Sequence, residues 1–462
     1  MSKILDKVYS YLPVGLQNVV ISIFGYLWQK RRFGGVFNEK LKEFKEREFF
    51  TKEQWKDYQN RQLKQLLINA FDNVPLYTEK YSNAGFSRAD LEKITIDTLH
   101  HLPLLEKNEV REFGKTSMLN IKKDPDGKFY ASSGSTGTPV NIYLSKKTHQ
   151  IWTAAYEIRV KNWAGVSKEM VRGMIGGRRI LPNAKLTLPV YRLNYFERMV
   201  YFSAYHIMPD SITNYLRGIK KHKVDFMMGY AMSNFLLAKF IKENKLSAPK
   251  LKAVITSSEK LTSEMRDTFQ EVYKCDSFDT WSGVEACAQI SECQYHSLHE
   301  SPDIGIIELI DSNDKIIDTG MGEAICTSLI NFDQPLIRYR CGDLLSLSQE
   351  QVCSCGRKMK VYDEIIGRLE DIVIGPDGRQ MVRFHGVFIN IPSIIKSQVI
   401  QHEVNHVEIR LKLTKPLTQD EEFTIINRMK SQLGDIHVQL VFTDDFIPGS
   451  NGKHKAVISN IK

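Results

Sequence analysis

The chain has 462 residues, 42% hydrophobic and 25% charged, so it is long enough for more than one packed core and lacks the composition of a disordered protein. Its formal net charge of +9 comes from 63 basic and 54 acidic residues scattered along the chain, which argues against a nucleic-acid groove and indicates mild attraction for anionic ligands. Seven cysteines, an odd number without a cleavable signal, favour a reducing, cytoplasmic compartment over a disulfide framework.

The first apolar segment, residues 12–28, is interrupted by a proline and polar residues, so we expect no transmembrane segment. Apolar residues at helical spacing predict an amphipathic helix, and a short basic run follows at residues 29–32. We expect its apolar face to dock on the protein's own domain, in preference to weak peripheral contact with a membrane. The apolar residues are Leu16, Val19, Val20, Ile23, Phe24 and Leu27.

Two further regions have the periodicity of scaffold helices. Residues 38–115 are charged and helical in pattern, with a turn expected at Pro75, and residues 147–160 predict another helix.

Between these regions, hydroxyl side chains and glycines are concentrated in Tyr130-Ala-Ser-Ser-Gly-Ser-Thr-Gly-Thr-Pro139. The two glycines can adopt backbone angles that let consecutive amides converge on phosphate oxygens. The alternating run at 140–144 places the loop between two strands, unlike a Walker loop, which needs Gly-Lys-Ser/Thr and a helix start. A flexible Ser/Gly linker is the alternative. The candidate nucleotide-binding residues are Ser132, Ser133, Gly134, Ser135, Thr136 and Gly137.

This loop resembles the phosphate loop of the adenylate-forming superfamily, which contains acyl-CoA synthetases and adenylation domains, in its phenylacetate-CoA ligase-like and capsular-polysaccharide branch. The resemblance implies an α/β fold, with a large nucleotide- and acid-binding domain of several subdomains over residues 1–366. It also implies a small mobile α+β domain that carries the catalytic lysine over residues 367–462. One departure is Thr138, where the family commonly has lysine.

A strand-helix-strand unit is predicted by apolar runs at 226–228 and 253–256 around a helical pattern at 233–242. Ligands of open α/β sheets bind at the carboxyl ends of such strands. Gly229-Tyr-Ala231 and Ser257-Ser258-Glu259 lie there, and the resemblance puts the second tripeptide near the adenine and the acyl group. A helix N-cap is a compatible alternative for that tripeptide.

Two later motifs resemble nucleotide-binding segments of the family. In Trp281-Ser-Gly-Val-Glu285, the resemblance implies that Trp281 packs near the adenine and that Glu285 binds Mg²⁺, an ion that usually takes one or two protein carboxylates beside phosphate. Ser282 and Val284 depart from the family pattern and remove one expected hydroxyl. In Arg338-Tyr-Arg-Cys-Gly-Asp343, the resemblance assigns the ribose hydroxyls to Asp343, and a turn aspartate is the alternative.

Four cysteine and histidine residues form a candidate zinc site. Two cysteines lie two residues apart, and a Cys/His pair lies about fifty residues upstream, a combination that would suit a closed structural Zn²⁺ site. The capsular branch carries a similar pattern. His296 is a competing histidine, and four buried reduced residues without metal are the alternative. The candidate ligands are Cys293, His299, Cys353 and Cys355.

The carboxyl-terminal part contains the family's mobile elements. Gly367-Arg368-Leu-Glu370-Asp371 resembles the hinge, with Arg368 reaching the nucleotide and with Glu370 and Asp371 as the pivot. Strand-like runs at 407–413 and 438–442 surround a helical segment at 418–433. Ile447-Pro-Gly-Ser-Asn-Gly-Lys453 resembles the loop whose lysine contacts the carboxylate and the α-phosphate, so Lys453 joins Glu285 and Arg368 as a catalytic candidate.

The resemblance therefore implies an AMP-forming ligase that uses ATP and Mg²⁺ to activate a carboxylic acid and passes the acyl group to coenzyme A or an amine, in surface-polysaccharide biosynthesis. One alternative is a coenzyme A-independent ligase for a sugar acid or amino acid. Another is a non-catalytic nucleotide-binding subunit of a polysaccharide assembly complex.

Overall fold

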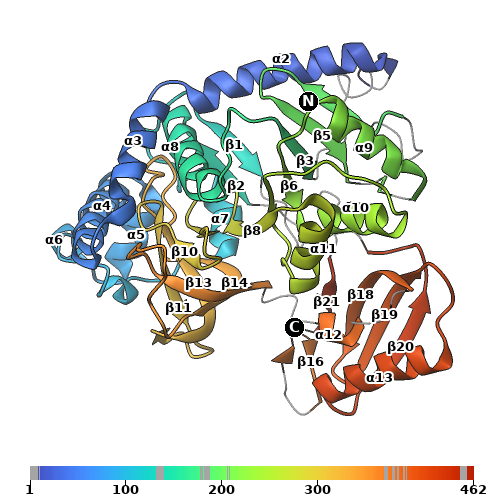
Figure 1. The fold of residues 1–462 in the computed structure, drawn as a ribbon. Helices are drawn as coiled ribbons and strands as arrows, with labels where there is room; N and C mark the ends of the chain where they lie inside the picture. The colour runs from blue at the N-terminus through green and yellow to red at the C-terminus, as the bar shows by residue number, and fades with distance from the viewer. Residues whose placement is uncertain are drawn as a thin grey trace. The chain divides into compact units, whose positions relative to one another are not determined.

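A computed structural model describes residues 9, 11–131, 140–176, 180–181, 188–204, 206–207, 209–368, 373–376, 380–381, 384–388, 391, 393–447 and 455–461 (Figure 1). The chain divides into two compact units, residues 1–341 with 345–365, and residues 342–344 with 366–462. The division near residue 366 is one residue away from the boundary expected from the sequence, and the roles of the two parts remain proposals.

The first unit begins with a helical region. Helix α4 starts with a capping box between Thr51 and Gln54, and α5 starts at Pro75, where a missing amide hydrogen is tolerated because the first helical amides have no intrahelical acceptor. The scaffold helices and the end of a helix before Pro75 are thus confirmed, whereas the turn expected at Pro75 is wrong: only Val74 separates the two helices, and Pro75 is itself helical. The helices are α2 (Val14–Phe33), α3 (Phe37–Glu46), α4 (Lys52–Asn73), α5 (Pro75–Asn83), α6 (Arg88–Leu91) and α7 (Lys107–Phe113).

A thirteen-stranded sheet forms the body of this unit. Strands β5, β3, β6, β7 and β8 run parallel to one another, and β8–β9 and β9–β10 pair antiparallel. In spatial order the strands are β12 (Ile316–Ile317), β11 (Gly305–Ile310), β13 (Gly320–Ser328), β14 (Tyr339–Leu347), β15 (Val361–Arg368), β10 (Leu298–Glu300), β9 (Gln289–Glu292), β8 (Asp276–Ser282), β7 (Ala253–Ser257), β6 (Phe226–Tyr230), β3 (Arg172–Gly176), β5 (Met199–Ser203) and β4 (Tyr191–Asn194).

The predicted strand-helix-strand unit is confirmed as β6, α10 (Ala231–Glu243) and β7, with β6 and β7 parallel. Residues of both strands are buried because helices cover the parallel part of the sheet, which explains their apolar composition. The helices of this region are α9 (Ile212–Lys221), α10 and α11 (Ser263–Tyr273). Helix α8 (Lys146–Tyr156) continues into a π-helical segment at Glu157–Asn162 and confirms the helix expected over residues 147–160.

The candidate phosphate loop connects two paired strands. Strands β1 (Lys128–Ala131) and β2 (Asn141–Leu144) are antiparallel, with Ala131 opposite Asn141. The expectation that the loop lies between extended segments is therefore confirmed, whereas residues 132–139 themselves lie outside the described residues.

Helix α2 docks on the open edge of the large sheet, along strand β4. The backbone amide of Leu193 donates to Asn18 Oδ1 at 3.0 Å, and the amide of Tyr195 donates to Ser22 Oγ at 3.0 Å. A Cβ at Gly25 would overlap the side chain of Asn194. The docked face thus combines polar and small residues with the buried Ile21, and its polar side chains bind the unpaired amides of an edge strand.

The expectation that this helix docks on its own domain is therefore confirmed, but most of its predicted apolar face is not the docking face: Val20 and Phe24 are half-buried and the other four residues are exposed. Leu16, Val19, Ile23 and Leu27 are 51%, 53%, 55% and 57% exposed. Among the described residues, no helix combines the length and the apolar character needed to cross a bilayer.

The second unit contains a four-stranded sheet in the order β20 (His437–Phe442), β19 (His406–Leu413), β18 (Ile394–Glu403) and β21 (Val457–Ser459). Helix α13 (Gln419–Leu433) starts with a capping box at Thr418 and contributes Ile425 and Met429 to a core shared with Val407 and Ile409. The predicted strands and helix are confirmed. The remaining elements are α12 (His385–Phe388), β16 (Val373–Ile374) and β17 (Gln380–Met381).

Candidate active site

The carboxyl ends of adjacent parallel strands meet at one edge of the large sheet. Strands β6, β7 and β8 end at Tyr230, Ser257 and Ser282. The structure thereby brings Ser258 and Glu259, which follow β7, to the same edge as Trp281 near the end of β8. Such edges bind ligands in open α/β sheets because the loops leave the backbone and side chains free to contact them.

Glu259 has a defined structural role at this edge. Its Oε2 accepts a hydrogen bond from the backbone amide of Met232, at 2.8 Å, in the first turn of α10. A carboxylate is favourable there because the helix dipole places partial positive charge at the N-terminus. The helix that follows Glu259 is capped instead by Thr262. Ser258 has a positive φ of 69° and is exposed at this edge of the sheet.

Glu285 lies in the turn between β8 and β9 and is half-buried. Among the described residues, its carboxylate has no hydrogen-bond or ion-pair partner. The side chain folds back over Gly283, where a Cβ would overlap its Oε2. Mg²⁺ prefers hard oxygen ligands, and a partly enclosed carboxylate with no cation beside it among the described residues suits that role. Trp281, two residues before this glycine, is half-buried against the main core.

The Arg-Tyr-Arg-Cys-Gly-Asp motif begins with Arg338, directly before β14, and continues through the first residues of that strand. Arg338 forms a buried ion pair with Glu308 at 3.0 Å, and Arg340 lies 3.2 Å from Glu323. Both arginines therefore stabilise the sheet, a role that the motif did not reveal. Asp343 is half-buried in the same strand.

Several candidates cannot be placed. Arg368 is the last residue of β15, and its side chain is not described. The remaining candidates lie outside the described residues: Ser132, Ser133, Gly134, Ser135, Thr136, Gly137, Thr138, Glu370, Asp371 and Lys453.

The structure brings the four candidate zinc ligands together. Their ligand atoms all lie within 4.8 Å of one another. Cys293 follows β9, His299 lies in β10, and Cys353 and Cys355 lie in the loop between β14 and β15. The Sγ atoms of Cys293 and Cys353 are 3.7 Å apart, and Cys355 Sγ is 3.4 Å from His299 Nε2. Tetrahedral zinc with Zn–S bonds of about 2.3 Å places two sulfurs roughly 3.8 Å apart, so the spacing fits the ion.

Backbone amides and aromatic rings enclose this cluster. The amides of Tyr295 and Cys355 donate to the sulfurs of Cys293 and Cys353, each at 3.4 Å, an arrangement that stabilises thiolates. The rings of Trp55 and Trp163 belong to the same buried cluster. The cluster is thus closed by protein, as a structural site would be.

His296, the competing histidine, is engaged elsewhere. Its Nδ1 lies 2.8 Å from Glu292 Oε1, and its ring stacks on Phe278 with 5.3 Å between ring centroids. The hydrogen bond to Glu292 raises the pKa of His296.

Asp279 is a carboxyl group in β8 that our sequence analysis did not select. Burial raises the pKa of Asp279 to about 7, and the charge of Glu292 contributes to the increase. Its Oδ1 accepts hydrogen bonds from the Thr280 amide at 2.9 Å and the Thr256 hydroxyl at 3.2 Å. The signal in the sequence is weak: a carboxyl group between Phe278 and Thr280 in a strand of mixed polarity.

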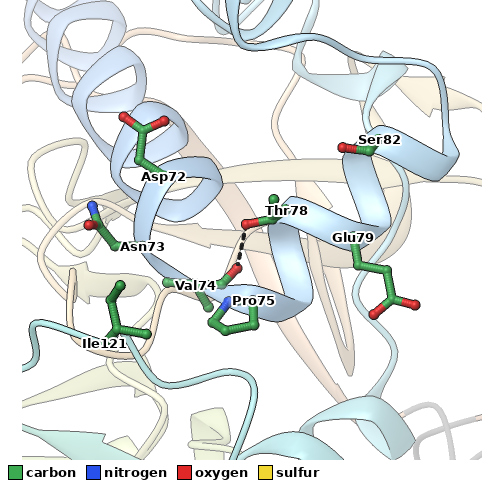
Figure 2. Close-up of a pocket in the computed structure, with 8 residues that line it drawn as sticks. All are labelled: Asp72, Asn73, Val74, Pro75, Thr78, Glu79, Ser82 and Ile121. Atoms are coloured by element: carbon green, nitrogen blue, oxygen red, sulfur yellow. Dashed lines mark hydrogen bonds between the residues drawn. The ribbon is translucent and has the colours of Figure 1, made fainter.

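A surface hollow of about 440 Å³ lies elsewhere, where α4 ends and α5 begins (Figure 2). Figure 2 shows Thr78 beside Val74, to whose carbonyl its hydroxyl donates at 3.3 Å. The hollow is lined by Asp72 to Pro75, Thr78, Glu79, Ser82 and Ile121 and contains none of the candidate site residues.

Comparison with known proteins gives three kinds of match. Residues 373–460 match the family described as the CapK C-terminal domain. The protein CapK of Staphylococcus aureus is 25% identical over 99% of this chain and 100% of its own length, and the phenylacetate-coenzyme A ligase of Escherichia coli is 22% identical over 86% and 92%. A 2-hydroxyisobutyryl-CoA ligase, solved in the postadenylation state with R3-HIB-AMP, covers 90% of this chain and 91% of its own at 18% identity and a TM-score of 0.70.

The structural likeness shows the fold, and the curated relatives extend over most or all of the chain. The expected α/β class with a small carboxyl-terminal α+β unit is confirmed. Together these matches support an AMP-forming ligase that is similar, over most or all of its length, to CapK and to a phenylacetate-CoA ligase.

Proposed function

We propose that this protein activates a carboxylic acid with ATP and then transfers the acyl group to coenzyme A. In the first step a carboxylate oxygen bonds to the α-phosphorus of ATP and pyrophosphate leaves. In the second, a thiolate bonds to the acyl carbon and AMP leaves. The observation that carries the proposal is the partly enclosed Glu285 carboxylate at the sheet edge, which among the described residues has no partner and fits a ligand of Mg²⁺.

The residue roles follow the resemblance and are part of the proposal. The loop at 132–137 binds phosphate, Ser258, Glu259 and Trp281 flank the adenine and the acyl group, and Asp343 binds the ribose. Bound Mg²⁺ would offset phosphate charge. Arg368 and Lys453 supply the cations that stabilise the charge of the transition state, and catalysis is chiefly positioning and charge neutralisation.

A role in surface-polysaccharide biosynthesis is favoured by the similarity to CapK, which extends over 99% of the chain. The activated acid would then be joined to a carrier or to a sugar amine of the polymer. A coenzyme A-independent ligase for a sugar acid or amino acid, and a non-catalytic nucleotide-binding subunit, are the competing functions that the experiment must separate.

The experiment is Mg²⁺-dependent pyrophosphate release from ATP across aryl, fatty, amino and sugar acids, with mass spectrometry of the products with and without coenzyme A. We expect one class of acid to respond and the Lys453→Ala variant to lose about 100-fold or more in rate. Lys415→Ala, an exposed loop lysine in the same unit, is the matched control and should retain the rate. ATP binding without pyrophosphate release from any acid would favour the non-catalytic subunit.

We also propose that Cys293, His299, Cys353 and Cys355 hold a structural Zn²⁺. The proposal rests on the sulfur spacing of 3.7 Å and on the enclosure of the cluster. The ion would link the β9–β10 hairpin to the loop before β15. We expect about one zinc per chain by elemental analysis, and loss of zinc in His299→Ala but not in His296→Ala. Protein that contains no zinc when produced in zinc-supplemented medium would contradict this.

A further inference from the structure

The outer face of α2 is apolar although it faces solvent. Leu16, Val19, Ile23 and Leu27 follow one another at intervals of three or four residues and therefore form one stripe along the helix. Each of the four side chains is more than half exposed. Single exposed apolar residues are common on protein surfaces, but a continuous stripe of four is not. The helix thus contacts the protein through a mixed side that buries Gln17, Ile21 and Gly25, while its most exposed side is apolar, which is unusual for a surface helix.

The turn between β4 and β5 extends this stripe. The ring of Phe196, 43% exposed, lies 5.1 Å from the ring of Tyr26 on α2, and Tyr195 beside it is 73% exposed. The turn and the helix are about 170 residues apart in the sequence and meet because Ser22 binds the amide of Tyr195. We call the four aliphatic residues of α2 together with Tyr26, Tyr195 and Phe196 the outer apolar face.

The two segments that form the outer apolar face contain almost no acidic residues. Residues 11–33 contain no aspartate or glutamate, and residues 188–203 contain only Glu197. Glu197 is buried, and its carboxylate is paired with Arg32. Lys30 is exposed at the end of the stripe, 4.5 Å from the centre of the Tyr26 ring. The face therefore combines aliphatic side chains, tyrosines and a lysine, in a chain with a net charge of +9.

We propose that the outer apolar face binds the surface of an anionic lipid bilayer, with α2 lying in the plane of the headgroups. Aliphatic side chains would enter the boundary of the acyl chains, while tyrosine rings and the lysine suit the headgroup region. Residues 11–33 and 188–203 contain a single acidic residue, and it is paired, which is complementary to anionic lipid. A second protein copy is less well matched, since a stable interface takes about 20–30 residues a side. Membrane attachment is independent of the proposed adenylation chemistry.

The test is cosedimentation of the full chain with large unilamellar vesicles of phosphatidylcholine alone or mixed with phosphatidylglycerol. We expect binding that increases with the phosphatidylglycerol fraction and falls about tenfold or more in a Leu16→Gln/Val19→Gln/Ile23→Gln/Leu27→Gln variant. Glutamine keeps helix propensity, and these side chains are exposed, so the variant should retain its melting temperature. Ile121→Gln/Met321→Gln removes exposed apolar side chains elsewhere in the same unit and should bind like the wild type.

Two results would overturn the proposal. One is equal sedimentation of the wild type and the fourfold variant with phosphatidylglycerol vesicles. The other is a wild-type protein that ignores vesicles but forms a dimer in analytical ultracentrifugation, with the dimer lost in the fourfold variant. That second result would assign the outer apolar face to a second copy of the chain.

Discussion

At the scale of single residues, Asp279 links stability to pH. The pKa of Asp279 is about 7 in the folded protein, whereas an aspartate in the unfolded chain has a pKa near 4. Between about pH 4 and pH 7, Asp279 therefore carries a proton in the folded state and has lost it in the unfolded state. The unfolded state therefore binds fewer protons in this window. The contribution of Asp279 to the free energy of unfolding accordingly decreases as the pH rises.

We predict that Asp279→Asn is more stable than the wild type at pH 8 and equal to it near pH 4. The amide keeps an oxygen acceptor for Thr280 and Thr256 but carries no charge. By linkage the difference reaches roughly 1 to 4 kcal/mol at pH 8. Urea unfolding at several pH values measures it, and a difference that does not change with pH would contradict the prediction.

Glu285 gives a second prediction at this scale, one that depends on the proposed function. Glu285→Gln removes the charge of the proposed Mg²⁺ ligand but keeps its shape. We expect the Mg²⁺ concentration for half-maximal pyrophosphate release to rise about tenfold or more. Glu350→Gln, an exposed glutamate in the loop after β14, serves as the control and should leave the Mg²⁺ titration unchanged.

At the scale of elements, α2 docks on β4 through a close approach of its backbone at Gly25 to the side chain of Asn194. Gly25 contacts Asn194, which is fully buried and donates to Glu197 at 2.6 Å. We predict that Gly25→Ala destabilises the protein by about 1–3 kcal/mol because the added methyl group must displace this amide. Gly15→Ala in the same helix has open space around its Cβ and should stabilise by about 0.5–1 kcal/mol. Thermal unfolding of both variants checks the pair, and equal effects would contradict it.

The elements also show where sequence reasoning succeeds. Local patterns predict β6, α10 and β7, because apolar runs around a helical period leave few alternatives. The same periodicity groups Leu16, Val19, Ile23 and Leu27 on one face of α2 but says nothing about which face contacts the protein. That choice depends on the unpaired amides of β4, far along the chain.

In the candidate site, too, local sequence patterns identify the residues, but only the fold shows which of them meet. Spacing identifies the Cys293/His299 pair and the Cys353/Cys355 pair, yet only strand pairing of β10 with β9 and β15 brings the two pairs together. The ion pairs of Arg338 and Arg340 with Glu308 and Glu323 were missed for the same reason, since their partners are distant in sequence.

At the scale of the whole molecule, the two units have separate cores. The carboxyl-terminal core is made from β18, β19, β21 and α13, with Val407, Ile409 and Ile425 fully buried. We predict that residues 366–462 expressed alone unfold in one cooperative transition, as measured by circular dichroism. Ile425→Asp places an unpaired charge in this core and should abolish the transition, whereas Phe423→Asp, on the exposed side of α13, should preserve it. A fragment without a cooperative transition would contradict the prediction.

The docking of α2 on β4 has a consequence for protein synthesis. An uncovered edge strand is a template for pairing with other chains. Partly folded chains expose such edges and are therefore prone to aggregate. Here the covering helix precedes the edge strand in the chain. At about 5–20 residues per second, the helix leaves the ribosome on the order of ten seconds before the strand that it covers. Helix α2 has therefore already been synthesised when β4 emerges, so it can bind the free edge of β4 in the nascent chain as soon as that edge forms.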